Sequence, residues 1–151
     1  IGPMGQIQVD GNIVFHQTTL YKHTINSVFT GINVERLPKV EMLLSYQDAS
    51  PKFLELVASD KEIKGVILLG LGAGLPANTQ EKALWQCVEA GKIVVRASKC
   101  STGEVLPTND FPSDKVLASG NLQPAKARIL LQLALCKSKD LKQLQQWMME
   151  H

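Results

Sequence analysis

Three glycines, Gly70, Gly72 and Gly74, directly follow an apolar run and form the stretch of the sequence best suited to chemistry. A backbone without Cβ atoms can turn sharply and approach a ligand or another element closely. Such a turn can face a phosphate, a small anionic substrate or simply the next helix. The residue types leave these three interpretations open.

The spacing of this glycine loop argues against a dinucleotide site. A GxGxxG pattern that starts at Gly70 requires glycine at position 75, where the sequence has Leu75, and Pro76 interrupts the expected helix start. Arg96 and Ser98 stand where an acidic residue should bind a ribose. A tight strand-to-helix turn without any ligand is the plainer alternative.

Other reactive side chains show no pattern typical of a catalytic or metal site. His16, His23 and His151 have no partner at metal-ligand spacing, so we expect no metal. No GxSxG motif is present. The three cysteines lack CxxC spacing, and we expect Cys87 and Cys136 to be buried thiols on apolar helix positions. Spacing alone therefore identifies no catalytic residue.

Composition limits the class of protein. The chain has 151 residues, of which 44% are apolar and 20% are charged, as in one ordinary globular domain. Its formal net charge of +2 is spread along the sequence and aromatic residues make up only 5%, so we expect no nucleic-acid partner. No apolar segment approaches the roughly 20 residues that span a bilayer, so we expect no membrane partner.

From residue 38 onward, short apolar runs alternate with amphipathic segments. Apolar runs without polar alternation are typical of strands covered on both faces of a parallel sheet. We therefore predict an α/β fold, a small doubly wound parallel sheet of about four strands with flanking helices, in a flavodoxin-like three-layer sandwich. The predicted strands are 40–46, 65–69, 93–97 and 116–118, and the predicted helices are 51–59, 79–90, 122–136 and 139–149.

Capping residues and apolar stripes set the expected helix positions. Ser50 is placed to cap the first helix, and Ser138 to cap the last. The residues of the first helix expected to face the core are Phe53, Leu54, Leu56 and Val57.

The first 37 residues differ from the rest, because they are polar and weakly periodic. Asp10 and Gly11 separate two short extended pieces, 6–9 and 12–17, which predicts a β-hairpin. A long stretch with few core candidates usually connects other parts of a protein. We predict an inter-domain linker arm over residues 1–37 and an α/β domain over residues 38–151.

Several segments, taken in order, resemble one known family. These are IGPMG, YKHT, LPKVEMLLSYQDASP, GVILLGLGAG, IVVRASKCSTG and ASGNLQPAKARILLQLAL. Together they resemble the carboxyl-terminal domain of a bacterial-type L-asparaginase, most closely the type II glutaminase-asparaginase branch. The resemblance covers essentially all 151 residues, and residues 119–135 are its most specific part.

The resemblance implies an amidohydrolase. Members hydrolyse L-asparagine to L-aspartate and ammonia, and in some cases L-glutamine too, through a threonine nucleophile and without metal or organic cofactor. Their catalytic threonines lie in a larger amino-terminal domain, with the segment matched by residues 2–5 at the junction. The resemblance therefore implies that these 151 residues are inactive alone. It also implies a homo-oligomer, a tetramer when complete, and a periplasmic or secreted location, with the cytoplasm as the alternative.

In the family, each active site lies between the large domain of one subunit and the small domain of another. By position, Gly72, Ala73 and Gly74 match the small-residue turn of the family, in which either alanine or asparagine occurs at the place of Ala73. Asn78 and Thr79 are the nearest polar groups that could reach the substrate's amino group. Asp110 best matches the acidic residue that completes this contribution, with Glu104 second.

Two departures from the family pattern affect this site. Leu75 fills a place that is polar in familiar members, and a Tyr-Gly pair that often precedes the fourth strand is missing between Lys115 and Val116.

Two other functions stay open, a stand-alone assembly or binding module and the asparaginase-like subunit of a tRNA-dependent amidotransferase.

Overall fold

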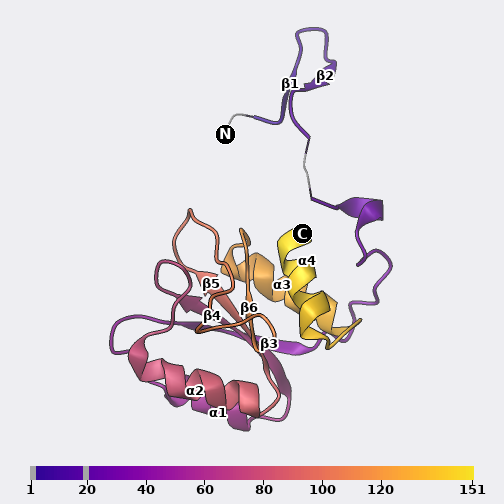
Figure 1. Cartoon of the computed structure of the whole chain (residues 1–151). Coiled ribbons are helices and arrows are strands. Elements are labelled where there is room, and N and C mark those ends of the chain that lie inside the picture. Colours follow the sequence, from indigo (N-terminus) through magenta and orange to yellow (C-terminus); the bar gives the residue numbers. More distant parts are fainter. Residues whose placement is uncertain (1–2, 19–20) are drawn as a thin grey trace.

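A four-stranded parallel sheet forms the centre of the molecule (Figure 1). The computed structural model describes residues 3–18 and 21–151. The strands lie side by side in chain order, and every neighbouring pair is parallel. They are β3 (Lys39–Leu44), β4 (Ile63–Gly70), β5 (Ile93–Ser98) and β6 (Val116–Ala118).

Helices cover both faces of this sheet (Figure 1). In β4, Val66 and Leu68 pack with α1 and α2, whereas Ile67 packs with α3 and α4. Burial on both faces explains why this strand is continuously apolar in sequence. The helices are α1 (Lys52–Ser59), α2 (Asn78–Glu89), α3 (Pro124–Leu135) and α4 (Leu141–Glu150). The predicted α/β class, with a parallel sheet and flanking helices, is confirmed.

Helix α1 buries a narrower stripe than predicted. Leu54 and Val57 are buried, but Phe53 and Leu56 are 64% and 62% exposed, so their predicted core position is wrong. Consecutive helical residues point about 100° apart, and a short helix lying on a sheet buries only one row of side chains. Positions 53 and 56 lie one step around the helix from that row.

Two further local predictions are corrected at the end of the chain. The cap of α4 is Asp140, whose carboxylate oxygen accepts the Lys142 amide N–H at 3.2 Å. The Ser138 hydroxyl lies before this cap and accepts the amide N–H of Asp140 itself, at 3.0 Å. Cys87 is buried as predicted, but Cys136 is exposed because α3 ends immediately before it.

Side chains of α3 and α4 reach the two outer strands of the sheet. At β6, the Gln145 amide both donates to the Ala118 carbonyl, at 3.0 Å, and accepts its N–H, at 2.8 Å. At β3, Arg128 donates to the Val40 carbonyl at 2.7 Å. Gln132 also donates to the Pro38 carbonyl, at 3.0 Å. Helix side chains thus occupy backbone groups that another strand would otherwise use.

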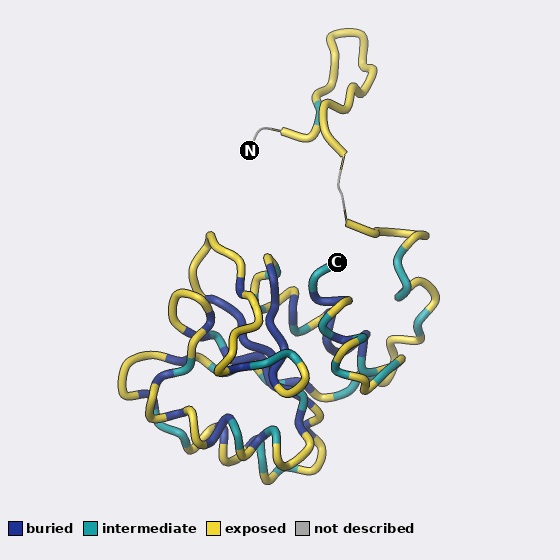
Figure 2. The backbone as a smooth tube through the Cα atoms, in the orientation of Figure 1, coloured by how far each residue is buried: buried dark blue, intermediate teal, exposed yellow. Residues whose placement is uncertain are grey.

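The amino-terminal region begins with the predicted hairpin, formed by antiparallel β1 (Gly5–Ile7) and β2 (Ile13–Phe15). This hairpin stands away from the sheet in Figure 1, and Figure 2 shows it almost entirely exposed. Beyond it, a short 3-10 helix, η1 (Thr24–Asn26), leads to Phe29, whose ring meets Trp147 of α4 edge-on at 5.3 Å between centroids.

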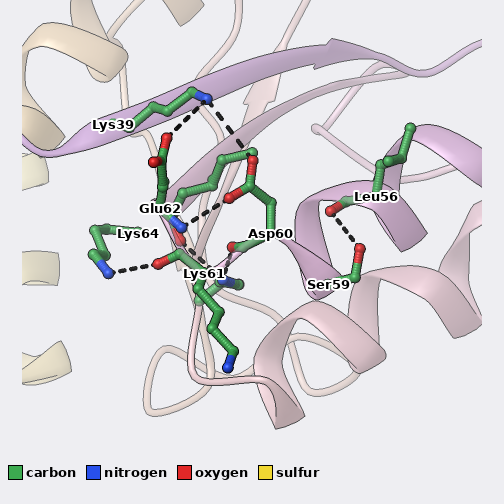
Figure 3. Close-up of polar contacts among 9 residues, drawn as sticks. Lys39, Leu56, Ser59, Asp60, Lys61, Glu62 and Lys64 are labelled. Carbon is green, nitrogen blue, oxygen red and sulfur yellow. Dashed lines mark hydrogen bonds and ion pairs between the residues drawn. The ribbon is translucent and has the colours of Figure 1, made fainter.

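The amino edge of the sheet carries several balanced charges (Figure 3). The Lys39 ammonium lies 3.8 Å from the Asp60 carboxylate and 3.9 Å from that of Glu62. The buried Lys92 donates to the carbonyls of Asp60 and Ile63, the latter at 2.9 Å. The pKa of Asp60 is lowered, mainly because its carboxylate accepts the Glu62 amide N–H, and Lys39 adds to this effect.

Candidate functional site

The glycine loop lies at the carboxyl end of β4 and folds back on that strand. Leu71 and Leu75 exchange two backbone hydrogen bonds, of 2.9 and 3.0 Å. A Cβ atom on Gly70 would lie only 2.4 Å from the Gly74 carbonyl carbon. Gly72 and Gly74 have φ values of 43° and 76°, which side-chain-bearing residues rarely adopt. The glycines are therefore required by the turn itself.

The segment after the loop is tied to the end of β3. The Ser45 hydroxyl accepts the Ala77 amide N–H at 2.8 Å, in a buried position. The Thr79 hydroxyl donates to the Ala49 carbonyl at 2.8 Å, which leaves its oxygen free to accept a hydrogen bond. Asn78 is the first residue of α2. These contacts hold the start of α2 at the carboxyl edge of the sheet.

Arg96 is the only fully buried charged side chain among the described residues, and it comes from the middle of β5. Its guanidinium donates from Nη1 to the Ala73 carbonyl, at 3.3 Å, and from Nη2 to the Leu106 carbonyl, at 2.8 Å. It also lies 4.8 Å from the centroid of the Phe111 ring. Burial lowers the pKa of Arg96 because desolvation disfavours the charged form.

Ser98 provides a second connection from β5 to the glycine loop. Its hydroxyl donates to the Gly72 carbonyl at 2.6 Å and accepts the Cys100 amide N–H at 3.0 Å. The glycine loop is therefore held at two successive carbonyls, those of Gly72 and Ala73, by two side chains from one strand.

The acidic candidates lie in the long loop after β5. Asp110 belongs to a turn in which Thr108 and Phe111 exchange backbone hydrogen bonds of 3.1 and 3.3 Å. Glu104 precedes Val105, which pairs with Gly120. Both residues are exposed.

The predicted site residues fall into separate surface features. Asn78 and Thr79 line one hollow of about 340 Å³ together with Asp48. Glu104 lines a different hollow of about 350 Å³, near the carboxyl-terminal helix. Ala73 and Asp110 are exposed outside these hollows, but Arg96 contacts the Ala73 carbonyl and the ring of the residue that follows Asp110.

Sequence reasoning assigned no role to Arg96, Ser98 or Phe111. One signal was available for the first of these. An arginine inside the apolar run IVVRA of a buried strand cannot reach water, so it must find acceptors from neighbouring loops. The aromatic partner had no comparable signal, because its contact depends on the path of an irregular loop.

Two other kinds of site have no candidate among the described residues. Within residues 3–18 and 21–151, no group of three or more His, Cys, Asp or Glu side chains could hold a metal ion. In the same residues no helix is long and apolar enough to cross a membrane. Burial raises the pKa of the Cys87 thiol to about 11, so this cysteine is protonated and poorly nucleophilic at neutral pH.

Known proteins match this chain along its length. The model of the Glutaminase/Asparaginase C-terminal domain matches residues 39–148. The chain is 34% identical to L-asparaginase 2 of Bacillus subtilis, over 100% of this chain and 40% of the relative. It is 35% identical to L-asparaginase 2 of Escherichia coli, over 96% of this chain and 42% of the relative.

A third relative, the glutaminase-asparaginase of Pseudomonas fluorescens biotype A, is 31% identical over 99% of this chain and 42% of its own length. The chain thus spans about two fifths of the length of these relatives. The chain belongs to the glutaminase/asparaginase family, of which it is a C-terminal domain.

Proposed function

We propose that this domain is part of an L-asparaginase, which hydrolyses L-asparagine with water to L-aspartate and ammonia. The observation that carries the proposal is the family match over residues 39–148, together with relatives that are themselves named L-asparaginase 2. The chain spans about two fifths of those relatives. By the family resemblance, the catalytic threonines are assigned to a larger amino-terminal domain. The 151 residues alone are proposed to be inactive.

The contribution of this domain is the carboxyl edge of its sheet, which is proposed to close the active site of a neighbouring subunit. The α-ammonium group of asparagine requires a carboxylate and neutral oxygen acceptors around it. Asp110 supplies the carboxylate, with Glu104 as the second candidate. Acceptors come from the side chains of Asn78 and Thr79, and the turn at Ala73 limits the space available to the substrate.

The proposed active site takes residues from two subunits, and a site shared in this way is active only in an oligomer. We propose a homo-oligomer, a tetramer when complete, with residues 1–37 linking the two domains. The hairpin supports a linking role, since Ile7, Ile13 and Phe15 are each more than half exposed and need apolar partners. L-Glutamine is a second proposed substrate, because one relative is named glutaminase-asparaginase.

Ammonia release tests the proposal. The complete protein, meaning this domain together with the preceding domain, should release ammonia from L-asparagine, while the purified 151-residue chain should release none above background. L-Glutamine measured in parallel gives the amide preference. Activity of the isolated chain would refute the proposed division of labour, and an inactive complete protein would refute the function.

A binding or assembly module is the other outcome of the same test. Sedimentation of the 151-residue chain and calorimetric titration with L-aspartate separate the two cases. A stable oligomer that binds aspartate without any hydrolysis by the complete protein would favour the module.

A further inference from the structure

Arg96 is a buried cation without a counter-charge. Its side chain is fully buried, and none of the ion pairs among the described residues includes it. Its Nε also has no hydrogen-bond partner in the described part of the chain. A buried charge is costly unless neighbouring groups compensate for it. What compensates here is two backbone carbonyls and one aromatic ring.

These three contacts belong to two different loops. The Ala73 carbonyl is in the glycine loop after β4, whereas the Leu106 carbonyl and the Phe111 ring are in the long loop after β5. Arginine suits this position because its planar guanidinium presents several donors in a fixed geometry and can also lie over an aromatic face. One side chain therefore connects both loops that carry the predicted substrate contacts.

The connection extends to Asp110 through its neighbour. The Phe111 ring contacts the Arg96 guanidinium and also stacks on the indole of Trp85, with centroids 5.8 Å apart and planes 5° apart. The backbone of Phe111 closes the turn that contains Asp110. Fixing this ring on α2 thus restricts the position of the adjacent carboxylate.

We propose that Arg96 is a positioning residue that sets the Asp110 turn relative to the glycine loop, so that the Asp110 carboxylate and the turn at Ala73 face the same substrate. This inference rests on the proposed function. It adds a residue that touches no substrate but determines the distance between two groups that do. Its loss should weaken substrate binding more than the chemical step, because the catalytic threonines are assigned elsewhere.

The test compares Arg96→Met with Lys92→Met in the complete protein. Lys92 is a matched control, since it is also a buried cation that donates to two backbone carbonyls, but at the opposite edge of the sheet. Arg96→Met should raise KM for asparagine by about tenfold or more with little change in kcat per folded enzyme. Lys92→Met should lower stability and leave KM unchanged. An unchanged KM in Arg96→Met would overturn the inference.

A double-mutant cycle distinguishes positioning from general destabilisation. If Arg96 acts through Asp110, then Asp110→Asn should raise KM much less in the Arg96→Met background than in the wild type. Fully additive effects would contradict the proposal. Should Arg96→Met fail to fold, Arg96→Lys keeps the charge and can reach one carbonyl, and it should give an intermediate rise in KM.

A measurement without catalysis separates this inference from the proposed function. In NMR spectra of the 151-residue chain, Arg96→Lys should shift the amide signals of residues 71–75 and 108–111 together, and Lys92→Met should shift neither group. A shift confined to one loop would refute the coupling even if the complete protein is active. A coupled shift with an inactive complete protein would refute the function and leave the coupling intact.

Discussion

The two edges of the sheet each bury one cation, yet they treat it differently. At the amino edge, Lys92 donates to two carbonyls beside the Asp60 carboxylate, which also faces Lys39. At the carboxyl edge, Arg96 has no carboxylate and relies on carbonyls from two loops and the Phe111 ring. A carboxylate is therefore available near the cation at the amino edge. At the carboxyl edge the cation is compensated only by carbonyl and aromatic groups, which the loops must bring to it.

This difference agrees with the proposal that the substrate binds at the carboxyl edge. Carbonyl groups of irregular loops are held weakly unless a hydrogen-bond donor binds them. A buried side chain can be that donor, but its own desolvation costs free energy. At the amino edge the Asp60 carboxylate lies close enough to the buried Lys92 to be affected by its charge, and it also pairs with the exposed Lys39. At the carboxyl edge one side chain, Arg96, contacts both the glycine loop and the loop that contains the Asp110 turn.

The largest expected effect is on stability. Arg96→Met in the 151-residue chain leaves two partly buried carbonyls without their donor and removes the contact with the Phe111 ring, so the free energy of unfolding should fall by about 3 kcal/mol. Lys92→Met should cost about 1–2 kcal/mol, because Lys92 is 9% exposed and Arg96 is fully buried, and because Lys92 has no aromatic contact to lose. Urea unfolding measures both. Equal losses would remove the energetic distinction between the edges.

Glycines of nearly identical conformation give a second comparison across the sheet. Gly74 and Gly91 have φ values of 76° and 75°, but a Cβ on Gly74 would lie 2.8 Å from Val105 Cγ1, whereas nothing lies within 4 Å at Gly91. Gly91→Ala should cost about 1 kcal/mol from backbone strain alone. Gly74→Ala should cost about 2–3 kcal/mol, because crowding adds to that strain.

The difference between these two alanine variants therefore measures how tightly the glycine loop packs on the loop after β5. Urea unfolding at one pH and temperature is sufficient. Indistinguishable variants would mean that Val105 moves aside freely, and that the two loops of the carboxyl edge are not closely packed.

A smaller effect concerns the charge proposed for substrate binding. Asp110→Asn in the complete protein should raise KM for asparagine by about tenfold, because a charge-assisted hydrogen bond to the ammonium group is lost. Asp114→Asn, an exposed aspartate in the same loop, is the matched control and should leave KM unchanged. Steady-state kinetics that show no change in either variant would remove Asp110 from the site.

The smallest expected effect belongs to the amino edge and depends on pH. The pKa of Asp60 is lowered from 3.8 in the folded state, first by the Glu62 amide and then by Lys39. A lowered folded-state pKa stabilises the fold above the unfolded value, and this contribution is lost as pH falls through the folded value. Asp60→Asn should therefore be slightly less stable than the wild type at neutral pH and match it well below pH 3.8. A difference that persists in acid would contradict this.

The sequence predicts the sheet well because each buried strand has a local signal. The run Val66–Leu69 is apolar throughout, and Val94 and Val95 repeat the pattern, so burial on both faces could be inferred without coordinates. Helix details were less predictable. Phe53 and Leu56 are apolar but exposed, and whether a partner covers them depends on parts outside this fold.

The site was predictable only in part. Gly72 and Gly74 are needed because the backbone has positive φ at both positions, and the glycines in the sequence are a direct sign of such a turn. The roles of Arg96 and Phe111 depend on an irregular loop that returns to the sheet, and no periodic pattern encodes such a path. The substrate contacts proposed at Asn78, Thr79, Glu104 and Asp110 rest on the family resemblance and stay predictions.

The helix side chains that bond to the backbone of the two outer strands also affect how readily this protein can aggregate. An open strand edge invites pairing with another chain and is a common start of aggregation. A foreign strand that approaches β6 must first displace the Gln145 amide from Ala118, and one that approaches β3 meets Arg128 at the Val40 carbonyl. The packing of α3 and α4 on the sheet therefore protects the domain against fibril-like growth. Partial unfolding of these helices would expose both outer strands, β3 and β6, at once.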